Sequence, residues 1–125
     1  AKRLQLKVGD PIFYVERLRQ SNNTPVAYER VYLPKNMYHE LEERVFVDSF
    51  HDYVQEELHW KIRNCVRAIE ARSVTKRIAE LLHQREGEPS LYMSSVTYLE
   101  NGRAFVYTRC YFHGEHFRFI HNFER

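Results

Sequence analysis

The sequence predicts an α+β domain with a mostly antiparallel β-sheet flanked by helices. Two strand–turn–strand patterns, one near each end of the chain, indicate the sheet, and helical periodicity lies between them. The 125 residues are 43% hydrophobic and 14% aromatic, which is enough to build one core and argues against disorder. Glycine and proline fall almost entirely between the periodic segments, where turns are expected.

Residues 12–20 and 26–33 predict the first hairpin. Because side chains alternate between the two faces of a strand, Arg17 and Arg19 share the more apolar face of the first strand. On the return strand, Glu29 also lies on a face with apolar neighbours. The alignment that we choose across the intervening loop places Arg17 opposite Glu29.

Helical patterns follow the hairpin. Over residues 35–46, apolar side chains recur at every fourth position, which predicts an amphipathic helix. A second helix is expected to begin after Ser49, which can cap it, with Asp52 three residues later. Its apolar stripe runs over residues 50–58. Ser73 is expected to open a third helix.

The remaining segments read as strands. Residues 61–71 alternate between apolar and polar side chains. Residues 91–99 and 103–112 predict a second hairpin, because the Asn101-Gly102 pair between them is a strong turn signal. A last strand is expected near 116–123. The predicted order is two strands, two helices, one strand, one helix and three strands.

Composition restricts the functional class. The formal net charge of +2 argues against a dedicated nucleic-acid surface. Cys65 and Cys110 lack a CxxC motif, which favours reduced thiols in an intracellular protein. The sequence contains no signal peptide and no apolar run of about 20 residues, so we expect a cytoplasmic protein without a membrane partner. The histidines show no metal-ligand spacing, and we expect no metal and no cofactor.

Arg17, Arg19 and Glu29 are the first candidates for a ligand site. Burial of charge costs free energy unless the charge is paired or binds a ligand. Residues two apart on a strand are about 7 Å apart, so two guanidinium groups can converge on one phosphate or carboxylate. A cross-strand ion pair without a ligand is the alternative, and the residues alone favour neither.

Ser49 is a further candidate. Its hydroxyl and the backbone N–H groups that follow can hold an anion at a helix start. An ordinary helix cap is the alternative reading of the same residue, and it is the commoner one. Both readings hold together if the helix start faces the hairpin.

Four segments of the chain occur in a characteristic order: GDPIFYVERLR, NNTPVAYERVYLP, VDSF and ENGRAFVYTRCYFHGEHFRF. Together they resemble the UTRA domain, which is the effector-binding half of the HutC branch of GntR-type transcription regulators. The similarity extends over nearly the whole chain, and the order and spacing of the motifs carry it more strongly than any single one.

The resemblance implies a chorismate-lyase-like fold for residues 1–125, with the family's leading strand missing and the winged-helix DNA-binding domain absent from this chain. It also implies allostery: a small metabolite binds here and changes how an attached winged-helix dimer binds DNA. The family's roles in holding the ligand carry over to Arg17, Arg19 and Ser49, and that of the hairpin glutamate to Glu29.

One wall of the implied pocket departs from the family pattern. Members that bind sugars often have Glu where this chain has Val106, and Tyr where it has Phe112. Strand alternation places both on one face with Thr108. This wall has lost a carboxylate and a hydroxyl, whereas the arginine pair is kept. We therefore expect an anionic effector, a sugar phosphate or a related metabolite, with a different or less polar tail.

Two other functions compete with the sensor. The chain can be a homodimerisation module with an empty cleft, since sheet edges offer a route for pairing. It can also be an enzyme, because the implied fold is shared with a lyase. No set of residues has an evident acid–base or nucleophilic role, so we assign no catalytic residue and do not expect an enzyme.

Overall fold

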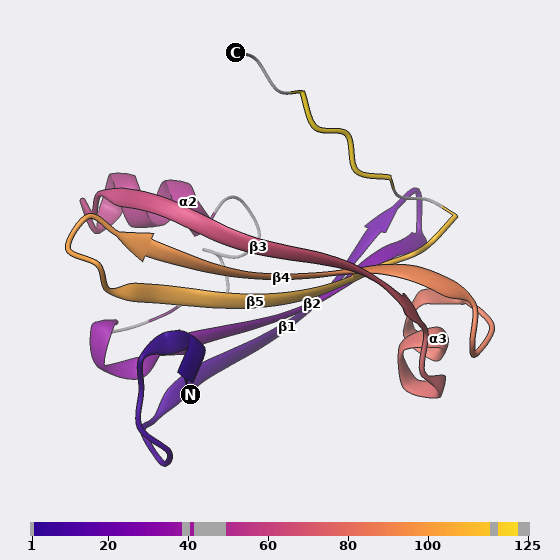
Figure 1. Ribbon diagram of the computed structural model, residues 1–125, viewed down its shortest axis with the longest axis horizontal. Helices are drawn as coiled ribbons and strands as arrows, with labels where there is room; N and C mark the ends of the chain where they lie inside the picture. Colours follow the sequence, from indigo (N-terminus) through magenta and orange to yellow (C-terminus); the bar gives the residue numbers. More distant parts are fainter. Residues whose placement is uncertain (1, 39–40, 42–49, 116–117, 123–125) are drawn as a thin grey trace. The chain divides into compact units, whose positions relative to one another are not determined.

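The computed structural model of the chain shows a five-stranded antiparallel sheet and two short α-helices in the part that it describes, which is residues 2–38, 41, 50–115 and 118–122 (Figure 1). The strand order is β1-β2-β5-β4-β3. The strands are β1 (Ile12–Ser21), β2 (Thr24–Pro34), β3 (Ile62–Ser73), β4 (Pro89–Leu99) and β5 (Ala104–Phe112). The predicted α+β class with a mostly antiparallel sheet is confirmed.

Tight turns close both predicted hairpins. Between β1 and β2, Asn22 and Asn23 adopt left-handed backbone angles, with φ of 51° and 63°, which asparagine tolerates better than most residues. Between β4 and β5, Gly102 has a φ of 87°, a value that favours glycine. The Asn101 side chain accepts a hydrogen bond from the backbone N–H of Arg103 at 2.9 Å. Local turn chemistry therefore explains both hairpins.

The predicted helix over residues 35–46 is not formed where the structure describes it. Only a 3₁₀ turn, η2 (Lys35–Met37), is present, and Tyr38 is already extended. Tyr38 is buried, and its hydroxyl donates a 2.6 Å hydrogen bond to the backbone carbonyl of Phe105. This core contact prevails over the helical periodicity. The remainder of the predicted helix, apart from Leu41, lies outside the described residues.

The second predicted helix is present as α2 (Phe50–Asp52), which continues directly as a π-helical turn, η3 (Tyr53–Glu57). Its predicted apolar stripe is confirmed, since Val54 is fully buried and the other apolar members pack against the same cluster. The predicted cap, Ser49, lies outside the described residues.

The third helix, α3 (Lys76–Leu82), is present but begins later than predicted. Its N-cap is Thr75, whose hydroxyl oxygen accepts from the backbone N–H of Ile78 at 3.5 Å. Ser73 is instead the last residue of β3, because extended pairing continues that far. Helix α3 therefore follows β3 after a very short connection (Figure 1).

The chain forms two compact units. The first consists of Ala1–Val15, Val31–Arg67 and Ser95–Thr108, and the second of Glu16–Arg30, Ala68–Ser94 and Arg109–Arg125. The strands each contribute residues to both units, as the bounds given above show. Each unit has its own hydrophobic clusters, so each is described separately below.

Phe105 is the centre of the main cluster of the first unit. It is fully buried, and its ring centroid lies 6.2 Å from that of Trp60 and 6.4 Å from that of Phe50. Burial, with a smaller contribution from Tyr53, raises the pKa of Tyr38 in the same cluster. The buried members are Val31, Leu33, Tyr38, Val54, Leu99, Phe105 and Val106. A second, smaller cluster contains Leu4, Val96 and Ala104.

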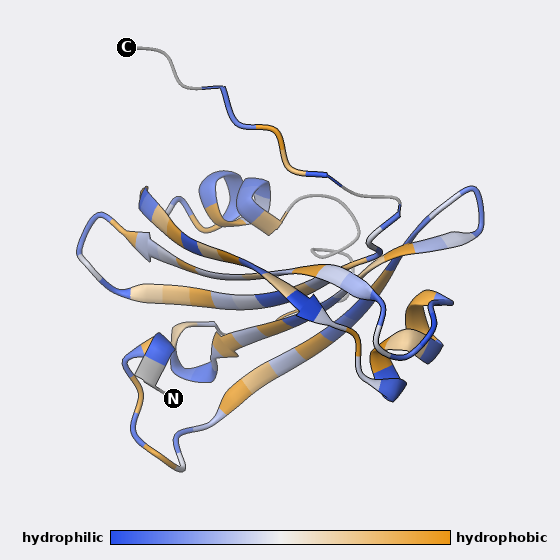
Figure 2. Ribbon diagram, turned by 45° about the vertical axis from the view of Figure 1, so that its right-hand side comes forward, coloured by the Kyte–Doolittle hydropathy of each residue, from blue (hydrophilic) through white to orange (hydrophobic). Residues whose placement is uncertain are grey.

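Helix α3 covers one cluster of the second unit. Its apolar face packs Ile78, Ala79 and Leu82 against Val74 and Tyr28. The mixed hydropathy that Figure 2 shows along α3 fits this one-sided burial. A separate small cluster holds Ala27, Cys110 and Phe112, with Leu91 and Met93 packed against it.

Two predicted strands behave differently from their patterns. β3 is confirmed as a strand, but every residue of it except Ile62 is exposed, including the apolar Val66 and Ile69. The strand predicted near 116–123 is wrong for residues 118–122, which have no regular secondary structure and expose Phe119 and Ile120. The other residues of that segment lie outside the described ones.

No helix in the described ranges is long and apolar enough to cross a membrane.

Candidate functional site

The β1–β2 hairpin brings the first pair of predicted site residues together. Arg17 lies on β1 and Glu29 on β2, and both belong to the second unit. The Arg17 Nη1 and Glu29 Oε2 atoms are 3.4 Å apart. Between the other halves of the same strands, the rings of Tyr14 and Tyr32 lie 5.1 Å apart. The predicted alignment of Arg17 with Glu29 is therefore confirmed.

The Arg17–Glu29 pair is close but leaves one oxygen without a hydrogen bond. The two side chains are 27% and 15% exposed, so water screens them only in part. Glu29 Oε2 is buried and accepts no hydrogen bond from the described residues, because its contact with Arg17 is an ion pair without hydrogen-bond alignment. A buried acceptor in this state favours any ligand that donates a hydrogen bond to it.

Arg19 lies two residues further along the same strand and is exposed. Strand alternation places it on the same side of β1 as Arg17, as predicted. Its positive charge acts on the buried Cys110 thiol, whose pKa it lowers. Along β1, Arg17 is therefore the more buried of the two arginines, and Arg19 is the more exposed one.

Cys110 forms part of the apolar floor beside these charges. The pKa of its thiol is raised to about 12, mainly by burial and in part by Glu29, while Arg19 and Arg17 act in the opposite direction. The thiol is therefore neutral at physiological pH. Ala27 and Phe112 pack with Cys110, and this buried position fits the predicted side for Phe112.

The structure does not place the other predicted site residues beside Arg17 and Glu29. Ser49 lies outside the described residues. Val106 belongs to the first unit, where it is buried in the cluster around Phe105, and Thr108 belongs to the same unit and is partly exposed. Their role in lining a ligand pocket stays a prediction.

Both cysteines are free, as the sequence indicated. Cys65 is exposed on β3, and Cys110 is buried on β5.

The second unit also contains a cavity that none of the predicted site residues lines. It has a volume of about 370 Å³, and Tyr92 and Tyr111 are on its wall together with several arginines. The spacing of Arg109 and Tyr111, two apart on one strand, was the available signal.

Comparison with known proteins gives a consistent family. The model of the family described as "UTRA domain" matches residues 1–118. The HTH-type transcriptional repressor NagR of Bacillus subtilis is 30% identical over 122 residues, covering 96% of this chain and 50% of the relative. The mannosyl-D-glycerate transport/metabolism system repressor MngR of Escherichia coli is 26% identical, covering 94% of this chain and 49% of the relative.

Solved structures show the same fold. The possible transcriptional regulator YydK from Bacillus subtilis has a TM-score of 0.91 at 27% identity, covering 98% of this chain and 54% of that one. The effector-binding domain of the Bacillus subtilis trehalose repressor has a TM-score of 0.86 at 25% identity, covering 99% of this chain and 86% of that one. The chain spans about half the length of the curated relatives that it matches.

Proposed function

The chain belongs to the UTRA domain family, and we propose that it is the effector-binding domain of a bacterial GntR-type transcription regulator of the HutC subfamily. In this proposal the regulator is cytoplasmic and homodimeric, and a separate winged-helix domain binds DNA. The function is binding and not catalysis, in line with relatives that are named as transcription regulators.

The hairpin pair is the observation that carries the ligand assignment. Arg17 provides a guanidinium that can bind a phosphate or carboxylate in a fork geometry. Glu29 provides a buried acceptor oxygen without a hydrogen-bond donor among the described residues. A ligand that carries both an anionic group and a hydroxyl or amine satisfies the two groups at once, and a sugar phosphate or related metabolite has this chemistry.

The neighbours of the pair define the rest of the proposed site. Arg19 supplies a second cation near the solvent side, and Ser49 supplies a hydroxyl, as the family resemblance implies. Cys110 and Phe112 are buried and add no charge at neutral pH. This apolar floor supports an effector whose tail is less polar than a free sugar.

Regulation would follow from linkage between two sites. A ligand changes DNA binding only if it binds one arrangement of the regulator more tightly than another. Binding at the hairpin exchanges the Arg17–Glu29 contact for contacts with the ligand. The resulting change in how the two strands are held is the proposed starting point for a response in the attached domain.

The test is isothermal titration calorimetry of the 125-residue chain with glucose 6-phosphate, glycerol 3-phosphate and citrate, and with glucose as the neutral probe. Binding of an anionic probe is expected, with no binding of glucose. Arg17→Gln should weaken that binding at least about tenfold, which is the effect of losing one charge-assisted hydrogen bond.

Arg85→Gln is the matched control, because Arg85 is exposed, lies in the same unit and carries the same charge. It should change the affinity by less than about twofold, since Arg85 lies outside the hairpin and solvent screens an exposed charge. Equal affinity of the parent chain and Arg17→Gln for every anionic probe would contradict the proposed role of the hairpin.

A further inference from the structure

Strand β2 has a neighbour on each side, so Glu29 faces side chains from two strands, β1 and β5. On the β1 side, Arg17 lies 3.4 Å from Glu29. On the β5 side, the backbone N–H of His113 donates to the carbonyl of Val26 at 2.9 Å. In an antiparallel ladder such a bond fixes which residues lie opposite one another, and it places Cys110 directly opposite Glu29.

Side-chain contacts agree with this register. It also places Tyr28 opposite Tyr111, and their ring centroids are 6.2 Å apart. Ala27 and Phe112, the next opposite pair, pack in one cluster with Cys110. Hydrogen-bonded and non-hydrogen-bonded pairs alternate along the ladder. The glutamate and the thiol therefore form a non-hydrogen-bonded pair, in which opposite side chains come closest.

Neither of these two neighbours satisfies Glu29. Its Oε2 atom is buried and has no hydrogen-bond partner among the described residues. The Arg17 guanidinium is close to this atom but lacks the alignment of a hydrogen bond. Cys110 is 2% exposed and carries a thiol, which is a weak donor. The thiol thus occupies the place opposite the carboxylate without satisfying it.

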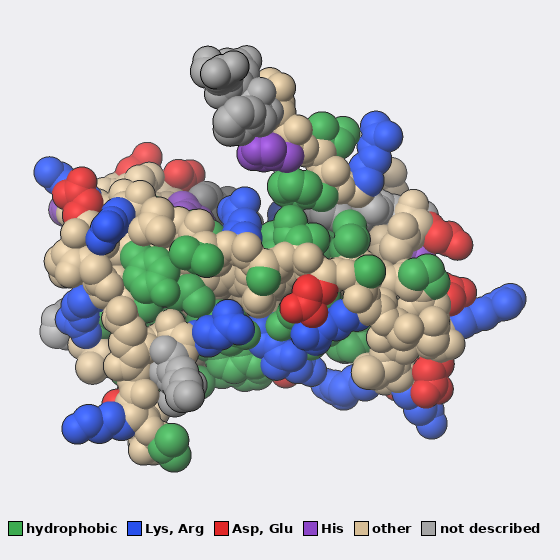
Figure 3. Space-filling view, in the orientation of Figure 1, with side chains coloured by type: hydrophobic (Ala, Val, Ile, Leu, Met, Phe, Trp, Pro, Cys, Tyr) green, Lys and Arg blue, Asp and Glu red, His purple; other side chains and the backbone are tan. Residues whose placement is uncertain are grey.

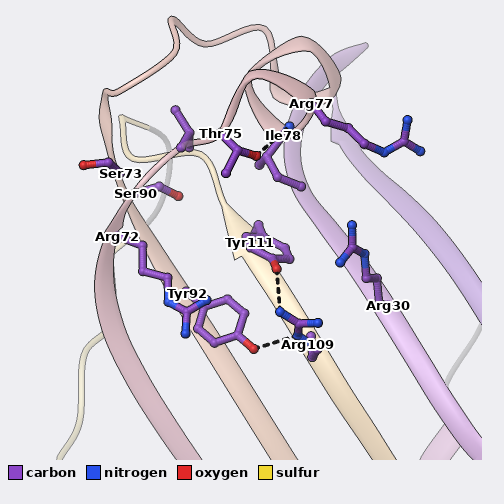
Figure 4. Close-up of a pocket in the computed structure, with 11 residues that line it drawn as sticks. Arg30, Arg72, Ser73, Thr75, Arg77, Ile78, Ser90, Tyr92, Arg109 and Tyr111 are labelled. Carbon is purple, nitrogen blue, oxygen red and sulfur yellow. Dashed lines mark hydrogen bonds between the residues drawn. The ribbon is translucent and has the colours of Figure 1, made fainter.

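The strong donors next to this pair in the sequence lie on the other face of the sheet. Arg30 follows Glu29 and Arg109 precedes Cys110, so strand alternation directs both arginines away from the pair. They line the cavity shown in Figure 4, where Arg109 donates to the Tyr92 hydroxyl at 2.8 Å. The side chains that pack with the thiol are apolar, so they offer no donor in place of these arginines.

We propose that Cys110 is a specificity-determining residue of the hairpin site, because its thiol keeps the buried acceptor of Glu29 available for a donor group of the effector. A serine hydroxyl at the same place would be a strong donor and would satisfy the acceptor without a ligand. This inference rests on the proposed function, in which the effector binds Arg17 and Glu29. It adds what the site selects, which is an anion with a neighbouring hydroxyl or amine over the same anion without one.

The selection follows from the cost of a buried acceptor without a donor. An effector that donates to Glu29 replaces the missing hydrogen bond, whereas an analogue without the donor covers the carboxylate and leaves it unpaired. Sites built around a buried hydrogen-bonding group reject such analogues strongly. When a serine at position 110 already satisfies the acceptor, the analogue no longer pays this cost, and the preference should be lost.

The test compares two phosphates by calorimetric titration of the 125-residue chain: glycerol 3-phosphate, which carries hydroxyls, and propyl phosphate, which carries none. The parent chain should bind glycerol 3-phosphate at least about tenfold more tightly. Cys110→Ser should reduce this preference to less than about threefold. Cys110→Ala adds no donor and should retain the preference, whatever its effect on the affinity itself.

A matched control separates this effect from general binding of phosphate. Lys and Arg side chains are spread over the face that the space-filling view presents, and a phosphate can associate with any of them (Figure 3). The ratio of the two affinities cancels this contribution, since both probes carry the same anionic group. Cys65→Ser makes the same chemical change at an exposed position on β3, and it should leave the preference within about twofold of the parent value.

A measurement without ligand tests the pairing itself. In urea denaturation, Glu29→Ala should destabilise Cys110→Ser more than it destabilises the parent chain, because it then also removes the hydrogen bond from the serine hydroxyl. In the Cys65→Ser background, Glu29→Ala should have the same effect as in the parent. Circular dichroism establishes which variants are folded. Cys110→Thr places the hydroxyl on a β-branched side chain suited to a strand, and it decides the matter if Cys110→Ser does not fold.

Equal binding of the two phosphates by the parent chain would overturn the inference. A folded Cys110→Ser variant that keeps the parent's preference, or that loses no more stability on Glu29→Ala than the parent does, would overturn it as well. The proposed function survives each of these results if Arg17→Gln still weakens phosphate binding. Failure of every anionic probe to bind the parent chain would contradict the proposed function and overturn this inference with it.

Discussion

A double-mutant cycle on Arg17 and Glu29 tests whether burial makes this ion pair contribute to the free energy of unfolding. At the observed 3.4 Å, two unit charges attract by about 5 kcal/mol for an effective dielectric constant of about 20. Desolvation cancels most of this attraction. Because the side chains are 27% and 15% exposed, we expect a coupling free energy of about 1–2 kcal/mol, between the values for surface pairs and for buried pairs.

The assay is urea denaturation of the parent chain, Arg17→Gln, Glu29→Gln and the double variant, analysed as a cycle of unfolding free energies. The Arg72–Glu70 pair is the matched control, since it is shorter, at 2.9 Å, but about half exposed. Its coupling should stay below about 0.5 kcal/mol. Additive effects of Arg17→Gln and Glu29→Gln, or a stronger coupling in the control pair, would refute the reasoning that burial outweighs distance here.

Three other perturbations follow from the structure. Phe105→Ala should lower the unfolding free energy by about 3–5 kcal/mol in urea denaturation, because the side chain is fully buried, whereas Phe119→Ala at a half-exposed position should cost less than about 0.5 kcal/mol. Thr75→Ala removes the cap of α3 and should cost about 1 kcal/mol in the same assay, and Thr75→Ser should restore most of it. The raised pKa of Cys110, about 12 against 9.0 when unfolded, gives stability that is complete below pH 9 and declines as pH rises towards 12. Between pH 8 and pH 10 the parent chain should therefore lose about 1 kcal/mol more than Cys110→Ala, and equal losses in the two proteins would contradict this burial effect.

Local patterns were sufficient for the hairpins. Strand alternation, with the alignment across the first loop, predicts Arg17 opposite Glu29, and the Asn-Gly pair predicts the turn between β4 and β5. These features depend on residues that are close in the sequence, where backbone geometry and turn chemistry dominate. The same kind of argument assigned α3, apart from its cap at Thr75.

Features set by distant contacts were predicted less well. The apolar repeat over residues 35–46 indicated a helix, but Tyr38 is extended and hydrogen-bonded to Phe105, which lies far away in the sequence. The alternation over residues 61–71 predicted a strand but not its burial, and β3 is at the edge of the sheet and is exposed almost throughout. Tertiary packing determines the conformation of the first segment and the exposure of the second, and a local sequence pattern does not report such packing.

The cavity lined by Tyr92 and Tyr111 in the second unit shows the same dependence on topology. It exists because β5 lies between β2 and β4 in the sheet, which brings Arg30, Arg109 and Tyr92 from three separate segments to one wall. Each of these residues looked ordinary on its own strand. Only the strand order, which the sequence pattern did not provide, brings them together around one cavity.

The most direct test of the effector-site assignment is to identify small molecules that remain bound to the chain during gentle purification. The protein is heat-denatured and the released metabolites are measured by mass spectrometry, for the parent chain and for Arg17→Gln prepared in parallel. The account predicts that an anionic metabolite is enriched with the parent chain and strongly depleted with the variant. Equal amounts of the same metabolite from both proteins would contradict the assignment of the hairpin as the place where the effector binds.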